Sequence, residues 1–395
     1  MPDAALPPPS PDALAHSERL SAALRAHIRD SGGAIPFSRY MELVLYAPGL
    51  GYYSAGARKF GAEGDFVTAP ELGPTFAQCV ANAAAPVLRE LAGETAFFEI
   101  GGGSGAFAEA ALKHFSAIDA LPTHYWLLEP SADLRERQQA RLREALVPEV
   151  FARCRWLDGP PEEKWRGVLF ANEVLDALPT PRFVVHEGEV YEEHVVLAAD
   201  GAFMRVDQPG DALLRGAVRH VEHDNEAPFA EGYRSEILPQ LPYWIQAVGG
   251  LLSDGVMLFV DYGYPRREYY LPERRDGTLV CHYRHRAHDD PFFLPGLQDL
   301  TAFVDFTALA ESGVNAGFDL AGYCSQASFL INHGLQERLE AIETEGDEAE
   351  RYRLHQEIKR LTLPGEMGER FQVMAFQRGV DIRAGFQRGD LRRRL

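Results

Sequence analysis

The chain has 395 residues, of which 46% are hydrophobic and 25% are charged, a composition typical of soluble globular proteins. Its 39 Lys and Arg residues against 58 Asp and Glu residues give a formal net charge of −19. This charge argues against a nucleic-acid-binding or anionic-membrane-binding protein, whereas a basic protein partner remains compatible with it. The length suits one elaborated domain or two.

The cysteines and the N-terminus bear on location. The four cysteines are far apart and none forms a C-x-x-C pair, so neither a disulfide framework nor a thiolate zinc site is expected. No uncharged apolar run reaches the roughly 18 residues that span a bilayer. The first residues, "MPDAALPPPSPDALAHSE", lack the composition of a secretory or mitochondrial targeting segment. We therefore expect a reducing, cytoplasmic location and no membrane insertion.

The N-terminal part is predicted to form an extension. Residues 1–17 are expected to be a flexible tail, and residues 18–92 to contain helices and a lid loop. The stretch "LSAALRAHIRDSG" predicts a short helix that the following glycines stop, and the Ala-rich residues 76–92 predict another helix. Residues 46–75 are rich in Gly and Pro with aromatics between them. A loop of that length is usually functional or disordered, and the aromatics argue against disorder.

From residue 93 to about residue 385, short apolar runs alternate with helical patterns. Such runs indicate parallel strands buried on both faces of a sheet. The alternation predicts a doubly wound, Rossmann-like α/β fold. The runs are "AFFEI" (96–100), "YWLLE" (125–129), "CRWL" (154–157), "GVLFANE" (167–173), "VMLFVDYG" (256–263), "FDLAGYCSQ" (318–326) and "FQVMAFQRG" (371–379).

Two insertions interrupt this alternation. Residues 182–245 begin with a stretch, 182–206, whose alternating pattern across Glu-Gly and Asp-Gly predicts a β-meander. Residues 264–310 are rich in Pro, Arg, His and Asp and are expected to be irregular and substrate-side. Residues 335–360 predict one charged amphipathic helix packed on one side.

A glycine-rich loop follows the first predicted core strand. "EIGGGSG" places Glu99 two residues before the first of the alternating glycines Gly101, Gly103 and Gly105. Ligands of an open parallel sheet bind beyond the carboxyl ends of its strands, where glycine lets the backbone approach and the next helix offers free N–H groups. The spacing differs from the G-x-G-x-x-G of nicotinamide-binding loops. An incidental tight turn is the alternative.

Acidic and polar residues end the other predicted strands. Glu129 can accept both hydroxyls of a ribose, in NAD and S-adenosylmethionine (AdoMet) alike. Asp158 stands where an adenine amino group could be met, or caps its loop. Asn172 and Glu173 end the fourth strand, and Glu173 with Asp176 would favour a cationic ligand at the head of a helix; capping of that helix is the alternative.

Six blocks along the chain together resemble the MidA-type family of class I AdoMet-dependent methyltransferases, which is related to the mitochondrial assembly factor of respiratory complex I. The resemblance covers roughly residues 35–380. The glycine loop is shared by many methyltransferases, whereas the first and fifth blocks are more specific. The blocks are "GDFVTAPELGPTFAQCV" (64–80), "EIGGGSG" (99–105), "ANEVLDALPTPRF" (171–183), "FVDYGY" (259–264), "DLTAFVDFTALA" (299–310) and "MGERFQVMA" (367–375).

The resemblance implies a seven-stranded class I sheet whose last two strands form an antiparallel hairpin, with AdoMet as the cofactor. Because the mitochondrial relative methylates an arginine of a complex I subunit, it implies a protein arginine as the acceptor. The acceptor protein itself and the oligomeric state stay open.

The candidate roles divide between cofactor and acceptor. Glu173 and Asp176 are the candidates for the acceptor, with Asp261 at the end of the fifth strand as a further carboxylate, unless it only caps the following turn. A lid near the methionine end of the cofactor is expected from Asp65, Thr68 and Glu71. Each acid could instead be a solvated charge at the rim of the sheet.

Two other functions compete with methyl transfer: an NAD(P)-linked oxidoreductase, disfavoured by the glycine spacing, and a non-catalytic assembly protein that retains the cofactor pocket. The block "CHYRHRAHDD" (281–290) has the residue types of a metal site. Its histidines His282, His285 and His288 need not converge, so no metal is expected.

Overall fold

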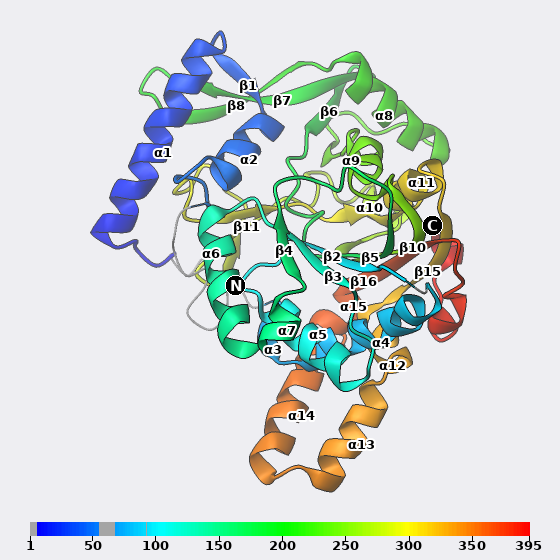
Figure 1. Ribbon diagram of the computed structural model, residues 1–395. Helices are drawn as coiled ribbons and strands as arrows, with labels where there is room; N and C mark the ends of the chain where they lie inside the picture. Colours follow the sequence, from blue (N-terminus) through cyan, green and yellow to red (C-terminus); the bar gives the residue numbers. More distant parts are fainter. Residues whose placement is uncertain (1–5, 55–67, 92) are drawn as a thin grey trace. The chain divides into compact units, whose positions relative to one another are not determined.

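The computed structural model describes residues 6–54, 68–91 and 93–395. The chain forms two compact units that alternate along the sequence (Figure 1). Unit 1 comprises Met1–Phe66, Asp176–Gln240 and Arg266–Phe303, and unit 2 comprises Val67–Leu175, Leu241–Pro265 and Val304–Leu395.

The core of unit 2 is an eight-stranded sheet in the order β15-β16-β10-β5-β2-β3-β4, with the short β14 paired to β10. Each apolar run predicted as a core strand forms one, which confirms the predicted α/β fold. The strands are β2 (Ala96–Ile100), β3 (His124–Leu128), β4 (Cys154–Leu157), β5 (Trp165–Asn172), β10 (Leu252–Tyr264), β14 (Val304–Asp305), β15 (Asp319–Ser325) and β16 (Phe371–Arg378).

The strands pair in parallel except where β16 is involved. β16 lies between β10 and β15 and is antiparallel to both, whereas β10, β5, β2, β3 and β4 are mutually parallel. The last two strands therefore form the expected antiparallel hairpin. All carboxyl ends of β2, β3, β4, β5 and β10 meet at one edge of the sheet, which is where ligands of open α/β sheets bind.

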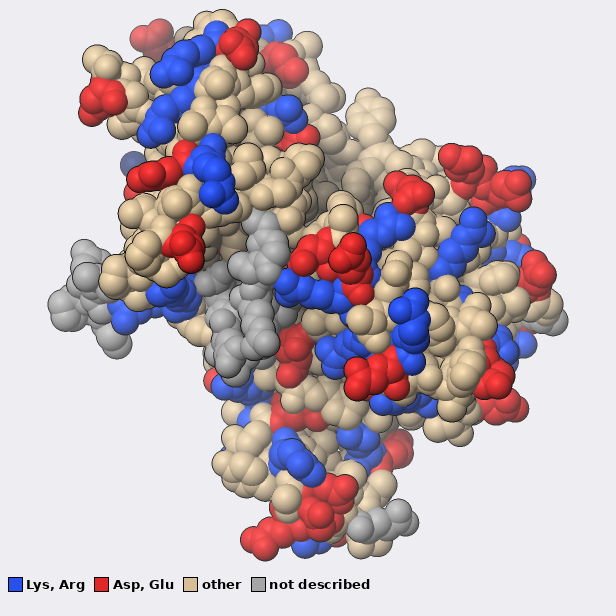
Figure 2. Space-filling view, turned by 60° about the vertical axis from the view of Figure 1, so that its left-hand side comes forward, with Lys and Arg blue, Asp and Glu red and all other residues tan. Residues whose placement is uncertain are grey.

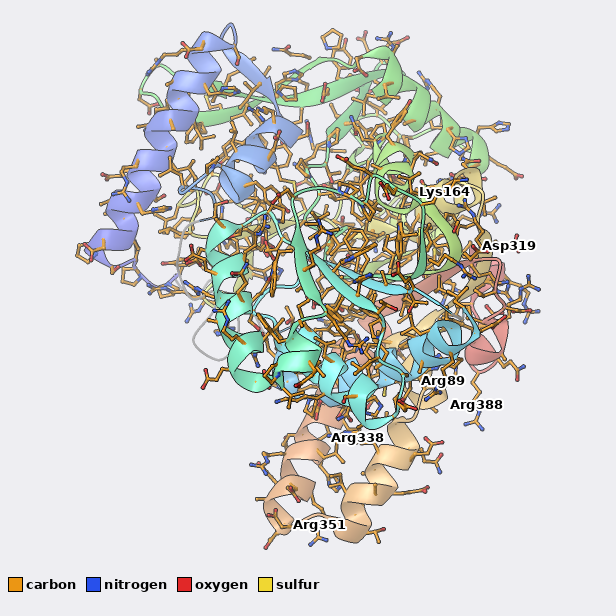
Figure 3. All side chains as sticks on the ribbon, viewed as in Figure 1. Arg89, Lys164, Asp319, Arg338, Arg351 and Arg388 are labelled. Carbon is orange, nitrogen blue, oxygen red and sulfur yellow. The ribbon has the colours of Figure 1, made fainter. Side chains whose placement is uncertain are left out.

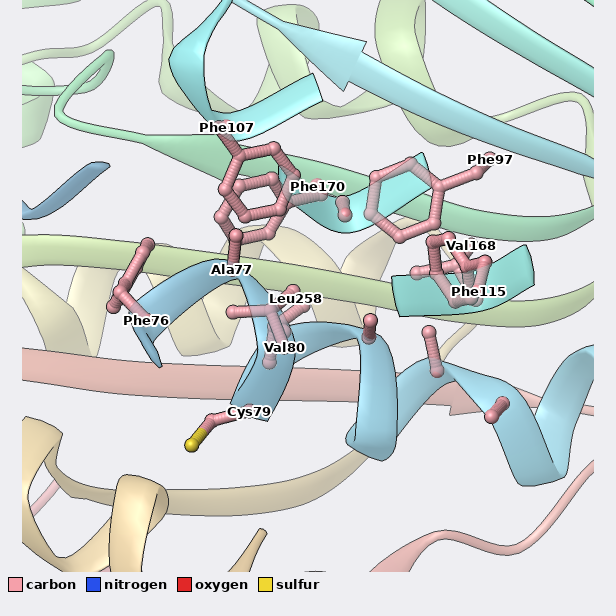
Figure 4. Packing of buried hydrophobic residues seen from close by; sticks show 14 of the residues in the cluster. Phe76, Ala77, Cys79, Val80, Phe97, Phe107, Phe115, Val168, Phe170 and Leu258 are labelled. Atoms are coloured by element: carbon pink, nitrogen blue, oxygen red, sulfur yellow. The ribbon is translucent and has the colours of Figure 1, made fainter. Parts of the chain in front are cut away.

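Helices cover this sheet, and aromatic side chains fill the space between them. Phe170 of β5 stacks on Phe107 of α5 with ring centroids 4.3 Å apart (Figure 4). Phe97 of β2 stacks on Tyr125 of β3. The helices of unit 2 are α3 (Ala69–Leu72), α4 (Thr75–Glu90), α5 (Ala106–Ala117), α6 (Ala132–Ala145), α7 (Pro148–Phe151), α9 (Leu241–Gly249), α11 (Phe306–Asn315), α12 (Gln326–Asn332), α13 (Leu335–Glu345), α14 (Glu348–Thr362) and α15 (Met367–Arg370), followed by the 3-10 turns η1 (Arg383–Phe386) and η2 (Arg392–Arg394).

The charged stretch 335–360 forms two helices, α13 and α14, rather than the single helix predicted. Asp347 begins α14 with a capping box, because its side chain accepts from the Glu350 N–H while the Glu350 side chain accepts from the Asp347 N–H. The pair projects from the rest of unit 2, with Arg338 near its base and Arg351 near its tip (Figures 1 and 3). In the sequence, Gly346 followed by Asp347 marks the point where α13 ends and α14 begins.

The helix α14 also holds the start of α4. Glu357 is buried, and its Oε1 accepts a 2.7 Å hydrogen bond from the backbone N–H of Thr75, the first residue of α4. Gly73, two residues earlier, leaves room for this carboxylate: a Cβ there would lie 2.5 Å from Glu357 Oε2. Glu357 of α14 therefore contacts the "ELGPT" segment (71–75) of the first family-specific block and fixes the start of α4.

Unit 1 contains the predicted β-meander. β6, β7 and β8 pair in antiparallel fashion, and the turn between β6 and β7 has positive φ at Glu187 (52°) and Gly188 (76°), as two-residue hairpin turns require. The meander is therefore confirmed. The elements here are α1 (Pro11–Asp30), β1 (Ala34–Pro36), α2 (Phe37–Tyr46), β6 (Arg182–His186), β7 (Glu189–Leu197), β8 (Phe203–Pro209), α8 (Ala212–Asp224), β9 (Arg234–Glu236) and α10 (Arg266–Tyr269).

The first helix begins earlier than predicted. α1 starts at Pro11, where the Ser10 side chain accepts from the Ala13 N–H, so residues 11–17 are helical rather than part of a flexible tail. Proline at the first helical position and serine before it are a helix-start signal, which the density of prolines in this stretch concealed.

The insertion 264–310 is more regular than expected. It contains the three-stranded sheet β12-β11-β13, made of β11 (Val280–Tyr283), β12 (Arg286–His288) and β13 (Asp299–Thr301). The strands are only three or four residues long, so their sequence pattern is too short to be distinguished from a loop.

Charges are interspersed over the face in Figure 2, where Lys and Arg alternate with Asp and Glu among the described side chains. Among the residues that the structure describes, no helix is both long and apolar enough to cross a membrane.

Candidate active site

The glycine loop after β2 adopts a backbone that glycine favours. Gly101, Gly103 and Gly105 have φ values of 72°, 52° and 80°, in the left-handed region that side chains with a Cβ disfavour. The loop closes through a 2.8 Å bond from Gly105 N–H to the carbonyl of Gly102, and α5 begins at Ala106. The amino end of α5 therefore follows directly from a loop whose backbone a ligand can approach.

Glu99 lies at the carboxyl end of β2 and is almost fully buried. Its Oε2 accepts a 2.7 Å hydrogen bond from the hydroxyl of Tyr125 on β3. Burial raises the pKa of Glu99 to about 8; the Tyr125 hydrogen bond opposes this rise and the negative charge of Glu129 adds to it. The carboxyl group that precedes the glycine loop therefore carries a proton at neutral pH in the absence of a cationic ligand.

Glu129 follows β3 and is also buried. Its Oε1 accepts from the backbone N–H of Ser131 at 3.0 Å and its Oε2 from Nε2 of Gln138 at 3.2 Å. Ser131 also caps α6 by accepting from the Leu134 N–H. The backbone donor just before α6 and the side-chain donor on α6 therefore hold this carboxylate in place.

The residue Gln138 was missed by sequence reasoning. It lies on α6 with no exposed surface, and besides Glu129 its Nε2 donates to the carbonyl of Gly103 at 2.9 Å. Its Oε1 accepts from Nε1 of Trp156 on β4 at 2.8 Å. The signal that could have found it is its spacing: Gln138 lies four residues from both Leu134 and Leu142, which places it on the buried face of α6.

The predicted lid residues are partly described. Asp65 lies outside the described residues. Thr68 is buried and precedes α3, where its carbonyl accepts from the Glu71 N–H. The Glu71 side chain accepts from the hydroxyl of Ser104 in the glycine loop. Helix α3 therefore contacts the glycine loop through this hydrogen bond.

Asp158 follows β4 but faces solvent. Its side chain is 92% exposed and pairs with Nη1 of Arg135 at 2.7 Å. Its contact with an adenine amino group stays a prediction, because the structure shows only the ion pair with α6.

Asn172 is the last residue of β5, and Glu173 follows it at the same edge. Asn172 Nδ2 donates to Glu173 Oε1 at 3.1 Å, and Asn172 Oδ1 is buried with no hydrogen-bond donor among the described residues. Glu173 has a φ of 53°, a conformation that costs free energy for a residue with a side chain and that concentrates at functional sites. The expected helix after β5 is absent, since residues 173–180 form bends and turns.

Asp261, near the end of β10, is buried and is bound to the loop that carries Glu173. Its Oδ2 accepts from the Leu175 N–H at 3.0 Å and its Oδ1 from the Tyr262 N–H at 2.9 Å. The carboxylate thus stabilises the turn after β5, whereas the alternative left open by the sequence was capping of the turn that follows Asp261 itself. A catalytic role for it stays a prediction.

Asp176 belongs to unit 1. It is buried, and its carbonyl accepts from the Ala302 N–H at 2.9 Å. The pKa of Tyr53 is raised, mainly by burial and next by the charge of Asp299, and the charge of Asp176 adds a smaller part. The Asp299 carboxylate accepts a 3.0 Å hydrogen bond from the Tyr53 hydroxyl. Asp176 therefore lies in an acidic, tyrosine-rich part of unit 1.

The three histidines of the sequence block are placed on a β-hairpin. His282 is on β11, His285 is in the turn and His288 is on β12. Among the described residues no group of three or more His, Cys, Asp or Glu side chains could hold a metal ion.

A separate pocket of about 570 Å³ is lined by α4, α5, the end of α12, the segment after it and α13. None of the predicted site residues lines it. The glycine loop and the rim carboxylates of unit 2 therefore remain the candidate site.

The arrangement at the edge of the sheet in unit 2 suits a ligand that contains both a sugar and a cation. Glu129 offers a held carboxylate for hydroxyls, and Glu99 and Glu173 are carboxyl groups at the ends of neighbouring strands. The amino end of α5 favours an anionic group such as an amino-acid carboxylate. These features fit AdoMet, and the residues that would hold it are Glu129, the glycine loop and the polar atoms of Asn172.

The comparisons with known proteins agree with this fit. Residues 79–324 match the family model described as "Putative S-adenosyl-L-methionine-dependent methyltransferase". The chain is similar to a protein from Burkholderia thailandensis whose crystal structure contains S-adenosyl-homocysteine, at 44% identity over 99% of this chain and 100% of that chain, with a TM-score of 0.92.

Two relatives carry names with an activity. One is the mitochondrial protein arginine methyltransferase NDUFAF7 homolog of Drosophila melanogaster, 27% identical over 95% of this chain and 89% of the relative. The other is the mitochondrial protein arginine methyltransferase NDUFAF7 of Bos taurus, 29% identical over 87% of this chain and 80% of the relative.

These relatives contradict the expected cytoplasmic location. Those from fly, rat and human are all named as mitochondrial. The expectation relied on the composition of the first residues, and the lack of a targeting composition there does not determine where a chain functions.

Proposed function

Because this chain belongs to that family of S-adenosyl-L-methionine-dependent methyltransferases, with AdoMet as the cofactor, we propose that it methylates an arginine of a partner protein. The relatives named as protein arginine methyltransferases support the arginine, since they align with most of the chain. The single structural observation that supports it is Glu173, a carboxylate held in a strained backbone conformation at the end of β5.

When bound, the cofactor would supply an electrophilic methyl group carried on a sulfonium, and its remainder would be the neutral thioether S-adenosylhomocysteine. The residues of the chain must position the acceptor and handle its proton. A guanidinium is a poor nucleophile because it is charged, with a pKa above about 12. We propose that the Glu173 carboxylate binds the guanidinium, concentrates its positive charge away from the attacking nitrogen and accepts the N–H proton lost on methylation.

Three other groups support this reaction without touching the acceptor. Glu129 would bind the ribose, the glycine loop would bind the methionine part, and Asp261 would hold the Glu173 loop through the Leu175 N–H. Asp176 is proposed as a second acceptor carboxylate. The lid role of Asp65, Thr68 and Glu71 is a proposal of the same kind, supported for Glu71 by its hydrogen bond with Ser104.

The test uses AdoMet with a deuterated methyl group, the purified protein and an extract of cells that lack it. Mass spectrometry is expected to find the label on arginine side chains of one or a few proteins. A respiratory complex I subunit, implied by the family resemblance, is the first acceptor to examine. The Glu129→Ala variant is the matched control and should transfer no label.

Other outcomes would select other functions. Label on lysine or on a small molecule would retain methyl transfer and reject the arginine. Binding of S-adenosylhomocysteine with no transfer to any acceptor would favour an assembly protein. A rise of the thermal unfolding midpoint with NAD but not with AdoMet would reject the methyltransferase itself.

A further inference from the structure

The side chain of Gln138 makes three hydrogen bonds that reach three parts of the cofactor side of the sheet. Its amide nitrogen donates to the Gly103 carbonyl and to Glu129 Oε2, and its amide oxygen accepts from Trp156. Gln138 thus joins the glycine loop after β2, the carboxylate after β3 and the indole of β4 from a single position on α6.

The orientation of this amide is determined by its partners. The indole N–H of Trp156 can only donate, whereas the Gly103 carbonyl and the Glu129 carboxylate can only accept. The oxygen of the amide must therefore face Trp156 and the nitrogen must face the other two. Both amide protons are then used, and one of them is a charge-assisted donor to Glu129.

The glycine loop also packs against this side chain. A Cβ at Gly102 would lie 3.2 Å from Gln138 Nε2, and a Cβ at Gly105 would lie 3.4 Å from Gln138 Cγ. The loop therefore lies on Gln138 as well as bonding to it, so a change at this position reaches the backbone of the loop directly.

We propose that Gln138 is a positioning residue that holds the Glu129 carboxylate in the orientation that binds the ribose of the cofactor, while its bonds to the Gly103 carbonyl and to Trp156 fix its own side chain. The proposal rests on the cofactor assignment above and on the ribose contact proposed for Glu129. The Ser131 N–H donates to one oxygen of Glu129 and Gln138 donates to the other, so loss of Gln138 removes a hydrogen bond that fixes the orientation of the carboxylate.

The test measures binding of two ligands to the full chain by titration calorimetry: S-adenosylhomocysteine and its 2′,3′-dideoxy analogue. Gln138→Met keeps the length of the side chain and removes all three hydrogen bonds. We expect it to weaken S-adenosylhomocysteine binding about ten- to a hundred-fold, the usual effect of losing a hydrogen bond to a charged group. Binding of the dideoxy analogue should change less than about three-fold, because the analogue lacks the groups that Glu129 binds.

The comparison of ligands separates positioning from a general structural effect. Damage to the fold of the loop would weaken both ligands equally, and that result would overturn the proposal. Equal binding of S-adenosylhomocysteine by Gln138→Met and the unmodified protein would overturn it as well. In a Glu129→Ala background, Gln138→Met should have little further effect on S-adenosylhomocysteine binding, as expected of residues that act as one unit.

A second variant applies if Gln138→Met does not fold. Trp156→Phe keeps Gln138 and an aromatic ring at this half-buried position, but removes the indole N–H that orients the amide together with part of the ring. It should weaken S-adenosylhomocysteine binding by a smaller factor than Gln138→Met, again with little effect on the dideoxy analogue, and equal losses for the two ligands would again reject the proposal. If the unmodified protein binds neither ligand, the cofactor assignment fails instead, which is a different result.

Discussion

The hydroxyl of Tyr125 donates a 2.7 Å hydrogen bond to Oε2 of Glu99 inside the core of unit 2, where both side chains are buried. The pair lies directly beneath the start of the glycine loop. Burial raises the pKa of Glu99 to about 8, so the carboxyl group takes part in the packing of the sheet as a neutral acid at physiological pH.

The raised pKa predicts a pH dependence of stability. A folded-state pKa above the unfolded value of about 4.3 means that the folded protein holds the proton more tightly. The stabilisation is complete below about pH 4.3 and is lost as pH rises towards 8, by up to about 1.4 kcal/mol per pH unit. Glu99→Gln should therefore gain stability relative to the unmodified protein from pH 5 to pH 8, measured by urea unfolding without cofactor.

Glu109→Gln is the control for this series. The pKa of Glu109 is lowered, since its hydrogen bonds with Lys113 and Arg141 outweigh the effect of burial. Its contribution should be present at neutral pH and lost in acid, the opposite direction. A Glu99→Gln variant whose stability runs parallel to that of the unmodified protein at every pH would show that Glu99 is ionised.

Gly73 tests the contact between α14 and the start of α4. Its backbone is extended (φ 160°), which any residue adopts, so only the lack of space matters. Gly73→Ala would place a Cβ 2.5 Å from the Glu357 carboxylate and should lower the free energy of unfolding by about 1–3 kcal/mol. Gly159→Ala, where no atom lies within 4 Å, should change it by less than about 0.5 kcal/mol. Equal thermal midpoints for the two variants would contradict the structure here.

Glu173→Gln tests the acceptor carboxylate. The amide keeps the shape of the side chain but accepts no proton and carries no charge. We expect S-adenosylhomocysteine affinity within a few-fold of the unmodified protein and loss of methyl transfer into the cell extract. Glu163→Gln, at an exposed position of unit 2, should leave both unchanged. Full turnover by Glu173→Gln would discard the assignment.

Asp261 distinguishes a holding role from proton transfer. Asp261→Ala removes both hydrogen bonds to the backbone, whereas Asp261→Asn keeps an oxygen that can accept from the Leu175 N–H. If the carboxylate holds the Glu173 loop, transfer rates should fall in the order unmodified, Asn, Ala, with cofactor affinity nearly constant. An Asn variant as inactive as the Ala variant would identify Asp261 as a proton acceptor.

Much of unit 2 follows from local patterns. Most core strands contain a short, mainly apolar run between helical patterns, because residues buried on both faces of a sheet are mainly apolar, whereas β4 is only partly buried. Two helix starts were predicted wrongly, and each depends on a single capping residue. Asp347 begins α14 through its capping box and so divides the charged stretch into two helices, and Ser10 caps the start of α1 within a proline-rich stretch. Both depend on side-chain hydrogen bonds, which periodicity does not record.

The candidate site divides in the same way. Glu99, Glu129 and the glycines could be placed because strand ends converge at one edge of a parallel sheet. Gln138 could not, since its role depends on which face of α6 meets the loop. The solvent-facing position of Asp158 was equally invisible, because it follows from the pairing with Arg135 on that helix.

The position of β16 constrains how the protein is synthesised. This strand comes from residues 371–378, yet it separates β10 from β15 in the sheet. During translation β15 therefore emerges with no neighbour to pair with, and β10 retains an open edge until residues 371–378 have been synthesised. A premature stop codon between β15 and β16 would leave two strand edges available for aggregation, so clearance of such truncated chains is the cellular consequence to look for.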